Sequence, residues 1–151
     1  MNPTQAMDEQ YIAHTYARFP VTFVRGEGAY LYDDSGKRYT DMGSGIAVSV
    51  LGYANAQWEQ ALCAQAHALS HVSNLYYTLP QAALAKLLCE RSGMALAFFG
   101  NSGAEANECA IKAARKYSAD KHGENVRPVI VSLVNSFHGR TLATLAATGQ
   151  E

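Results

Sequence analysis

The sequence predicts a mixed α/β fold, in which an antiparallel meander of short strands precedes helices that alternate with parallel strands. Two patterns carry this expectation. From residue 21 to residue 41, short runs of β-favouring residues are separated by turn signals containing Gly and Asp. In the last third of the chain, apolar runs alternate with helical segments, and this order is typical of a parallel sheet with right-handed crossovers.

Composition excludes several classes of protein. The chain has 151 residues, of which 48% are apolar and 17% charged, and its net charge is -1. These values fit a single globular domain and give no basic excess for binding nucleic acid. The longest mostly apolar stretch, residues 45–54, is about half a membrane span. The polar N-terminus and three cysteines without a Cys-x-x-Cys pair favour a cytoplasmic protein with no membrane partner.

The first half of the chain is expected to form three strands and one helix. Residues 1–20 show no strong period. The strands are expected at residues 21–24, 29–32 and 37–41, with turns at 25–28 and 33–36. Residues 43–52 contain three glycines and are expected to be irregular. A helix over residues 56–70 would bury an apolar stripe formed by Trp58, Leu62 and Leu69.

The second half is expected to alternate between helices and buried strands. One helix begins near Pro80 and ends at Gly93. A longer helix covers residues 103–117, with Glu108 and Lys112 paired on its outer side. Another helix begins at Thr141. The stripe of the 103–117 helix that would pack on a sheet consists of Ala106, Ala110, Ala113 and Tyr117. The apolar runs at residues 94–99 and 129–134 would be the parallel strands of that sheet.

Two strand-to-helix loops are the candidate functional segments. They comprise residues 100–104 and residues 135–140. Because such loops leave a parallel sheet at its carboxyl edge, where ligands collect, we expect the two loops to be neighbours.

The first loop enters a helix at Ser102 and Gly103. Free N–H groups and the helix dipole favour an anion there, and Gly103 admits a phosphate close to the backbone. The alternative is a capping box between Ser102 and Glu105, and a carboxylate at Glu105 would repel a phosphate. The loop is not a Walker P-loop, because no Gly-Lys-Ser/Thr follows.

The second loop offers an aromatic face at Phe137, an imidazole at His138 and a guanidinium fork at Arg140. A ring could stack on Phe137, and Arg140 suits a carboxylate or a phosphate. The alternative is a core Phe, a turn His and a surface Arg.

A metal site is the remaining possibility. Cys63, His67 and His71 are spaced i, i+4 and i+8 on the 56–70 segment. Each step drifts around the helix by about 40°, so that three side chains do not converge easily on one ion. We therefore expect no metal site.

The chain resembles the class III pyridoxal-phosphate aminotransferases, and within them the acetylornithine aminotransferases. Three segments carry the resemblance: residues 101–108 (NSGAEANE), 111–117 and 137–141 (FHGRT). Supporting matches occur at residues 16–21, 26–33, 45–48 and 73–78, so the likeness covers nearly all of residues 14–150. It implies the N-terminal part of a fold-type I PLP-dependent transferase. Residues 1–52 would be the N-terminal arm and part of the small domain, and residues 53–151 the truncated beginning of the large cofactor domain.

The resemblance also implies roles for individual residues. Ser102, Gly103 and Ala104 match the segment that holds the phosphate of pyridoxal 5'-phosphate, and Phe137 matches the residue stacked on its pyridine ring. Arg140 matches the residue that binds the α-carboxylate of the substrate, and Tyr16 an aromatic that shapes the substrate pocket.

The implied reaction transfers an amino group from N-acetylornithine to 2-oxoglutarate in arginine biosynthesis, in a homodimer. The amino donor could instead be ornithine, succinylornithine or 4-aminobutyrate. Two alternatives without catalysis also stay open: a module that binds a phosphorylated ligand, and a fragment whose loops serve only packing. None of the five lysines lies in the family's Schiff-base lysine motif. That lysine is expected beyond residue 151, and we expect these 151 residues alone to be inactive. Residues 51–56 depart from the family's Leu-Gly-His pattern, with Tyr53 in place of His.

Overall fold

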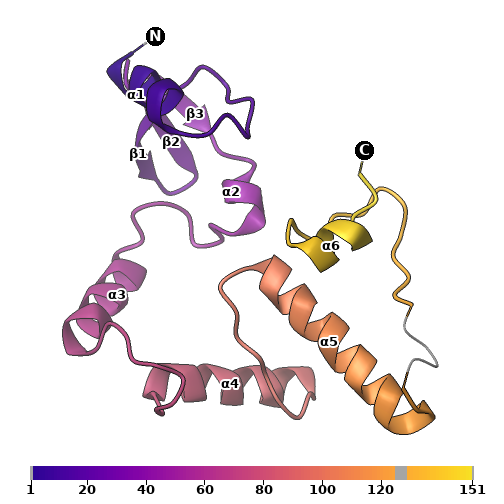
Figure 1. Ribbon diagram of the computed structural model, residues 1–151. Helices are drawn as coiled ribbons and strands as arrows, with labels where there is room; N and C mark the ends of the chain where they lie inside the picture. Colours follow the sequence, from indigo (N-terminus) through magenta and orange to yellow (C-terminus); the bar gives the residue numbers. More distant parts are fainter. Residues whose placement is uncertain (1, 125–128, 151) are drawn as a thin grey trace. The chain divides into compact units, whose positions relative to one another are not determined.

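The computed structural model describes residues 2–124 and 129–150, and these residues form two compact units. The first unit covers residues 1–73 and the second residues 74–151. The first contains a small antiparallel sheet and three helices, and the second contains three helices joined by loops (Figure 1). The mixed α/β class is thereby confirmed. The division into a small-domain part and a large-domain part at residue 52 stays a prediction about the longer protein.

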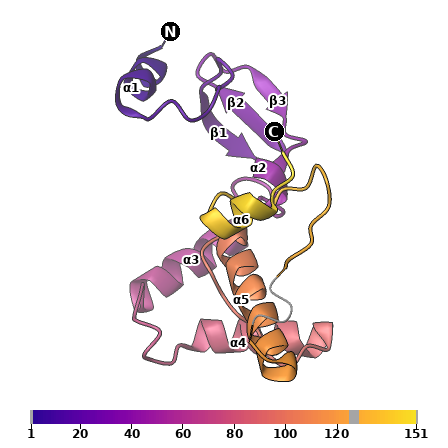
Figure 2. The same cartoon turned by 45° about the vertical axis from the view of Figure 1, so that its right-hand side comes forward.

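The sheet of the first unit is a three-stranded meander of β1 (Phe23–Glu27), β2 (Tyr30–Asp33) and β3 (Arg38–Thr40) (Figure 2). All neighbours are antiparallel, in the order β1-β2-β3, which confirms the predicted topology. β1 continues through residues 25–27, where a turn was expected. Residues 25–27 stay in the strand because their backbone pairs with residues 30–32 of β2. The Arg25 guanidinium adds side-chain contacts, 3.7 Å from the centre of the Tyr32 ring and 2.7 Å from the Glu27 carboxylate.

The turn between β2 and β3 is organised by the buried carboxylate of Asp33. Its Oδ1 accepts hydrogen bonds from the Ser35 hydroxyl at 2.6 Å and from the backbone N–H of Ser35 and Lys37 at 3.0 and 2.9 Å. Its Oδ2 accepts one from the Tyr39 hydroxyl at 3.0 Å. These donors, with the Ser35 hydroxyl first, lower the pKa of Asp33 below its ordinary value.

The first helix, α1 (Pro3–Tyr11), was not predicted. Residues 1–20 show no strong apolar period, which is the signal on which the expectation relied, and no residue of α1 is buried. Its start was nevertheless readable in the sequence. The Asn2 side chain accepts from the Gln5 backbone N–H at 2.9 Å, the Gln5 side chain accepts from the Asn2 N–H at 3.2 Å, and Pro3 occupies the first helical position.

Residues 43–55 link the sheet to the next helix. The short α2 (Ser44–Ala47) contains left-handed backbone at Gly45 and Ile46. The expected irregular segment therefore forms, apart from this single distorted turn of helix. The helix α3 (Ala56–Ala68) is capped by Asn55, whose side-chain oxygen accepts from the Trp58 N–H at 3.0 Å. The predicted burial of the Trp58, Leu62 and Leu69 stripe is wrong for this structure, because each residue is roughly half exposed.

Tyr53, the departure from the family pattern, is built into the first unit. Its backbone exchanges two hydrogen bonds with Gly28, and its hydroxyl donates to Asp41 at 2.6 Å. A Cβ at Gly26 would lie 2.4 Å from the Tyr53 ring, so the ring occupies space that only glycine leaves open. The hydrogen bond lowers the pKa of Asp41 and raises that of Tyr53.

The second unit consists of α4 (Leu79–Ser92), α5 (Gly103–His122) and α6 (Leu142–Ala147). The three predicted helices are confirmed. Gly93 ends α4 with a φ of +74°, and α5 continues to His122, beyond the expected end at Tyr117. The predicted packing stripe of α5 is wrong: Ala106, Ala110, Ala113 and Tyr117 are all exposed. The half-buried side chains lie on another face, which includes Ala104, Asn107, Glu108 and Ile111.

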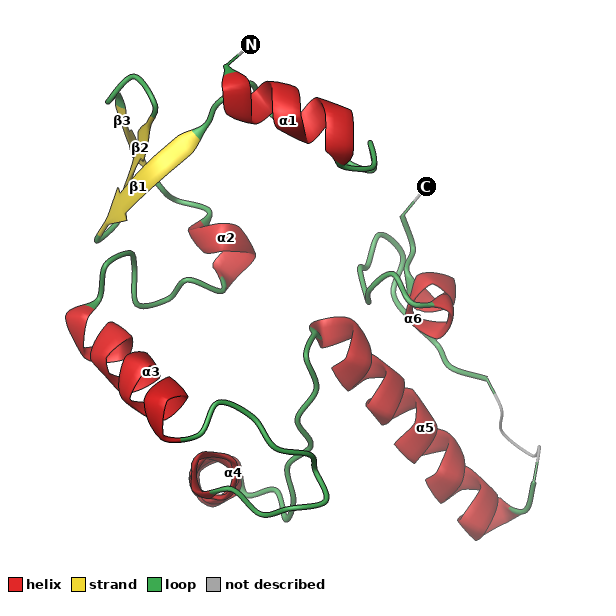
Figure 3. Cartoon of the chain, turned by 60° about the vertical axis from the view of Figure 1, so that its left-hand side comes forward, coloured by secondary structure: helices red, strands yellow, loops and turns green. Residues whose placement is uncertain are grey.

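The parallel strands predicted at residues 94–99 and 129–134 do not form in the described part of the chain, where both runs are loops (Figure 3). Val131 and Leu133 are 89% and 81% exposed. An extended segment becomes a strand only when a neighbour pairs with its N–H and C=O groups, and the described residues supply none to these runs. Apolar composition shows that a run can be buried, but it does not supply the neighbouring strand that the run needs.

The centre of the second unit is the contact between α5 and α6, which lie side by side near the beginning of α5 (Figures 1 and 2). No apolar side chain among the described residues is fully enclosed, whereas the Thr144 side chain of α6 is completely buried. The most deeply buried side chain of this unit is therefore polar, and it lies beside the second candidate loop.

Candidate functional site

The first candidate loop ends at the N-terminus of α5. The Ser102 hydroxyl accepts from the Glu105 N–H at 3.2 Å, which is the predicted helix cap. Within the described residues, the N–H groups of Gly103 and Ala104 have no hydrogen-bond acceptor, and a Cβ at Gly103 would meet nothing within 4 Å. Two donors and the Ser102 hydroxyl proton are thus presented at the positive end of a 20-residue helix.

The carboxylate of Glu105 turns back towards the loop. It accepts hydrogen bonds from the Asn101 backbone N–H and, at 3.4 Å, from the Asn101 amide. It lies close to Gly100. The capping box is therefore shifted by one residue, since the Glu105 side chain binds Asn101 and not the Ser102 N–H. The carboxylate is thus turned towards residue 101, where two neutral donors stabilise it, and not towards the N–H group of Gly103.

The second candidate loop presents Phe137 and Arg140. The Phe137 ring is 55% exposed, and the Arg140 guanidinium lies 5.7 Å from its centre. The described surroundings enclose the His138 Nε2 atom without a hydrogen-bond partner. Phe137 is therefore no core residue in the described structure, whereas the roles of Phe137 and Arg140 in binding stay predictions.

The two loops meet, as predicted, at Gly139 and Ala104. A Cβ at Gly139 would lie 2.6 Å from the Ala104 Cβ and 2.8 Å from the Thr144 hydroxyl. Gly139 is buried and has a φ of +127°, so both the conformation and the space at this position require glycine. The expected reason, a shared sheet edge, does not apply in this structure. The contact is made by α5, α6 and the loop itself.

Two further residues of α5 fasten the second loop, and the sequence interpretation missed both. The Asn107 amide donates to the His138 carbonyl at 2.8 Å, and the Thr141 hydroxyl donates to Glu108 at 2.5 Å. Glu108 was expected to pair with Lys112 on the outer side of the helix. That expectation is wrong, because Glu108 is half-buried on the side that contacts Thr141. No local signal identifies these residues, since their partners are 31 and 33 positions away.

Other predicted residues fall outside this cluster. Tyr16 belongs to the first unit and is 58% exposed. Among the described residues, no group of three or more His, Cys, Asp and Glu side chains is arranged to hold a metal ion. No helix in the described ranges is both long and apolar enough to cross a membrane.

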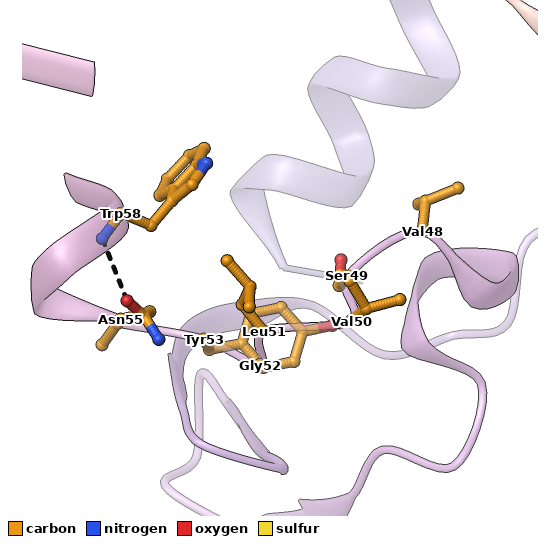
Figure 4. A pocket seen from close by; sticks show the side chains of 9 residues that line it. Val48, Ser49, Val50, Leu51, Gly52, Tyr53, Asn55 and Trp58 are labelled. Atoms are coloured by element: carbon orange, nitrogen blue, oxygen red, sulfur yellow. Dashed lines mark hydrogen bonds between the residues drawn. The ribbon is translucent and has the colours of Figure 1, made fainter. Parts of the chain in front are cut away.

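The first unit contains a separate hollow of about 420 Å³ (Figure 4). It is lined by residues 48–55 and Trp58. Its lining is mainly apolar, and its one ionisable group, the Tyr53 hydroxyl, already donates to Asp41. The Asn55 cap of α3, with its hydrogen bond to the Trp58 N–H, belongs to this lining (Figure 4). Unlike the α5 site, this hollow has no arginine, lysine or histidine in its lining.

Comparison with known proteins decides the family. The family model described as "Aminotransferase class-III" matches residues 11–151. The chain belongs to this family. The class-III aminotransferase chain is 57% identical over 145 residues to the acetylornithine aminotransferase of Haemophilus ducreyi, which covers 96% of this chain and 37% of that protein. It is 51% identical over 148 residues to the acetylornithine aminotransferase of Wolinella succinogenes, with coverage of 97% and 38%.

Solved structures agree with this assignment. An aminotransferase from Bacillus anthracis superposes with a TM-score of 0.87 at 38% identity, covering 99% of this chain and 35% of that one. The N-acetylornithine aminotransferase from Stenotrophomonas maltophilia superposes with a TM-score of 0.79 at 37% identity, covering 89% and 35%. The class-III aminotransferase chain therefore spans a little over a third of the length of the relatives it matches. The N-terminal part of the predicted fold is confirmed.

Proposed function

We propose that the complete protein is a pyridoxal-phosphate-dependent aminotransferase that moves an amino group from N-acetylornithine to 2-oxoglutarate, in arginine biosynthesis. The observation that carries the proposal is the meeting of the two loops at Gly139 and Ala104. This contact places the backbone at the start of α5, with its open N–H groups, against the segment that carries Phe137 and Arg140. The 57% identity to an acetylornithine aminotransferase supports this choice of donor.

The residues of this site fit the proposed cofactor. A phosphate needs several donors without a competing side chain, and Gly103, Ala104 and the Ser102 hydroxyl provide them, with open space at Gly103. A planar ring needs an exposed aromatic face, which Phe137 provides. When bound, pyridoxal phosphate supplies the aldehyde that condenses with an amine and the ring that accepts an electron pair.

The residues of this chain would bind and orient the cofactor and the amino donor. Ser102, Gly103 and Ala104 hold the phosphate, and Phe137 fixes the plane of the ring. Arg140 pairs in bidentate fashion with the α-carboxylate of the amino donor, and a second arginine for 2-oxoglutarate is expected further along the complete protein. Tyr16 shapes the donor pocket. The Schiff-base lysine is expected further along the complete protein, which we expect to be a cytoplasmic homodimer.

A second candidate is another class-III transaminase specificity. The solved structures that superpose on the chain include an omega transaminase from Pseudomonas jessenii at 31% identity and the ornithine aminotransferase of Toxoplasma gondii at 27%. The higher identity to acetylornithine aminotransferases favours the first candidate. A module that binds a phosphorylated ligand without catalysis would not need Phe137 and Arg140 beside the helix.

The test is an absorbance scan of the full-length protein with pyridoxal phosphate, before and after adding N-acetylornithine. We expect the visible band of the bound cofactor to fall while the shorter-wavelength band of its pyridoxamine form rises. An Arg140→Ala variant should bind the cofactor but respond only at much higher N-acetylornithine concentrations. A visible band that ignores N-acetylornithine but responds to ornithine or 4-aminobutyrate would favour the second candidate. The absence of a visible band would refute the aminotransferase proposal.

A further inference from the structure

Arg140 lies in a short span of backbone that is fastened to α5 at both ends. On one side, the His138 carbonyl accepts from the Asn107 amide at 2.8 Å. On the other, the Thr141 hydroxyl donates to the Glu108 carboxylate at 2.5 Å. Asn107 and Glu108 are adjacent on α5, so two consecutive helical residues hold both ends of the two-residue segment Gly139–Arg140.

A third contact fixes the same segment against the start of α5. Gly139 packs on Ala104, one helical turn before Asn107 and Glu108. One turn of helix is about 5 Å long and rigid, so the three contacts set the distance from the Gly103 N–H group to the Arg140 backbone. Fully buried Thr144 completes the arrangement, because its hydroxyl accepts from the Thr141 N–H at 3.0 Å.

We propose that Asn107 and Glu108 are positioning residues, which hold Arg140 at the correct distance from the phosphate-binding end of α5 for recognition of the substrate carboxylate. The inference rests on the proposed function, since it assumes that Arg140 binds a carboxylate and that Gly103 and Ala104 bind the phosphate. Neither Asn107 nor Glu108 needs to touch the substrate. Their amide and carboxylate are already engaged by the loop.

The chemistry predicts which substitutions matter. Asn107→Asp removes the donor at nearly constant size and places an oxygen against the His138 carbonyl. Glu108→Ala removes the acceptor of the Thr141 hydroxyl, whereas Glu108→Gln keeps an acceptor oxygen and should preserve function. Thr141→Val and Thr141→Ser probe the same hydrogen bond from the loop, since only the serine keeps the hydroxyl. Asp120→Asn is the matched control, because it converts an exposed carboxylate of the same helix to an amide.

Binding without turnover is the first readout. The ligand is N-acetylnorvaline, which has the α-carboxylate and carbon skeleton of N-acetylornithine but no amino group to transfer. In the full-length holoenzyme, we expect Asn107→Asp, Glu108→Ala and Thr141→Val to raise its dissociation constant about 10- to 100-fold. Glu108→Gln, Thr141→Ser and Asp120→Asn should stay within about threefold of wild type. The dissociation constant of pyridoxal phosphate should change little in all six variants, because the phosphate donors belong to α5 itself.

Two comparisons separate positioning from general damage. The KM for N-acetylornithine should rise, while the KM for its counterpart without the carboxylate, N-acetyl-1,4-diaminobutane, should not. In an Arg140→Ala background, Asn107→Asp should have no further effect on N-acetylnorvaline binding, since the group it positions is gone.

The outcomes are distinct. If all folded variants bound N-acetylnorvaline with wild-type affinity, the inference would be overturned while the proposed function would stand. The same holds if Asn107→Asp weakened N-acetylnorvaline binding as much in the Arg140→Ala background as in the wild type. An equal rise in KM for N-acetylornithine and for N-acetyl-1,4-diaminobutane would show a purely structural role and would also overturn the inference. If the wild-type protein bound no pyridoxal phosphate, the proposed function would fail and the inference with it. Thermal melting identifies any variant that does not fold, and the Thr141 pair then tests the same hydrogen bond.

Discussion

Replacement of Gly139 by alanine is the most direct test of how the two loops are joined. The substitution adds one methyl group at a position with a φ of +127°, 2.6 Å from the Ala104 Cβ and 2.8 Å from the Thr144 hydroxyl. Backbone strain of this kind costs about 1–3 kcal/mol. Overpacking by an extra methyl group costs about 1–3 kcal/mol more, because the Ala104 backbone on α5 cannot move independently of the helix. The expected loss of unfolding free energy is therefore about 2–6 kcal/mol.

Gly93→Ala is the matched control for this substitution. Gly93 also has a positive φ, +74°, but a Cβ there would meet nothing within 4 Å. Its replacement should cost only the strain, about 1–2 kcal/mol. The difference between the two variants reports the clashes with Ala104 and Thr144 together.

The assay measures the unfolding free energy of the full-length apoprotein by urea denaturation, with unfolding monitored by two spectroscopic probes. Ala104→Gly in the Gly139→Ala background removes the contacting Cβ and should restore part of the loss, beyond the sum of the two single effects. Equal destabilisation by Gly139→Ala and Gly93→Ala, or no rescue by Ala104→Gly, would refute the conclusion that the loops are pressed together at this point.

Three other predictions follow from local contacts. Because the folded pKa of Asp33 is lowered, its carboxylate contributes stability that is fully present above the ordinary value of 3.8 and is lost as the pH falls through the folded pKa. Melting temperatures should therefore show a gap between wild type and Asp33→Asn at neutral pH that closes in acid, and a pH-independent gap would contradict this. Asn55→Ala and Ser102→Ala each remove a helix cap and should each lower the unfolding free energy, measured by urea denaturation, by about 1 kcal/mol. Only Ser102→Ala should also weaken the binding of pyridoxal phosphate. Residues 1–151 expressed alone should be inactive and bind a hydrophobic dye or aggregate, since no apolar side chain among the described residues is fully enclosed. A soluble monomer that melts cooperatively would count against that expectation.

Hydrogen bonds between near neighbours explain what was predictable here. The turns around Asp33, the caps at Asn55 and Ser102, and the stop of α4 at Gly93 each depend on residues within about four positions of one another. Even the missed helix α1 has such a signal, in Asn2, Pro3 and Gln5. The family, too, was recognisable from contiguous motifs, and the match over residues 11–151 confirms it.

Long-range partners explain what was not predictable. Residues 94–99 and 129–134 have the composition of buried strands, but a strand requires a neighbour for its backbone groups, and composition does not supply one. The stripe of α5 was assigned to the wrong face, because helical periodicity says which residues share a face but not which face meets α6.

The sequence by itself determined the antiparallel meander, the helices α3 to α6 and the two loops that carry the candidate chemistry of this protein. Only the tertiary structure decided that Gly139 rests on Ala104 and that Asn107 and Glu108 hold the loop of Arg140. The physical reason is the range of the interactions. Caps and turns close within one turn of backbone, whereas these contacts join residues more than 30 positions apart and exist only once α5 and α6 have packed.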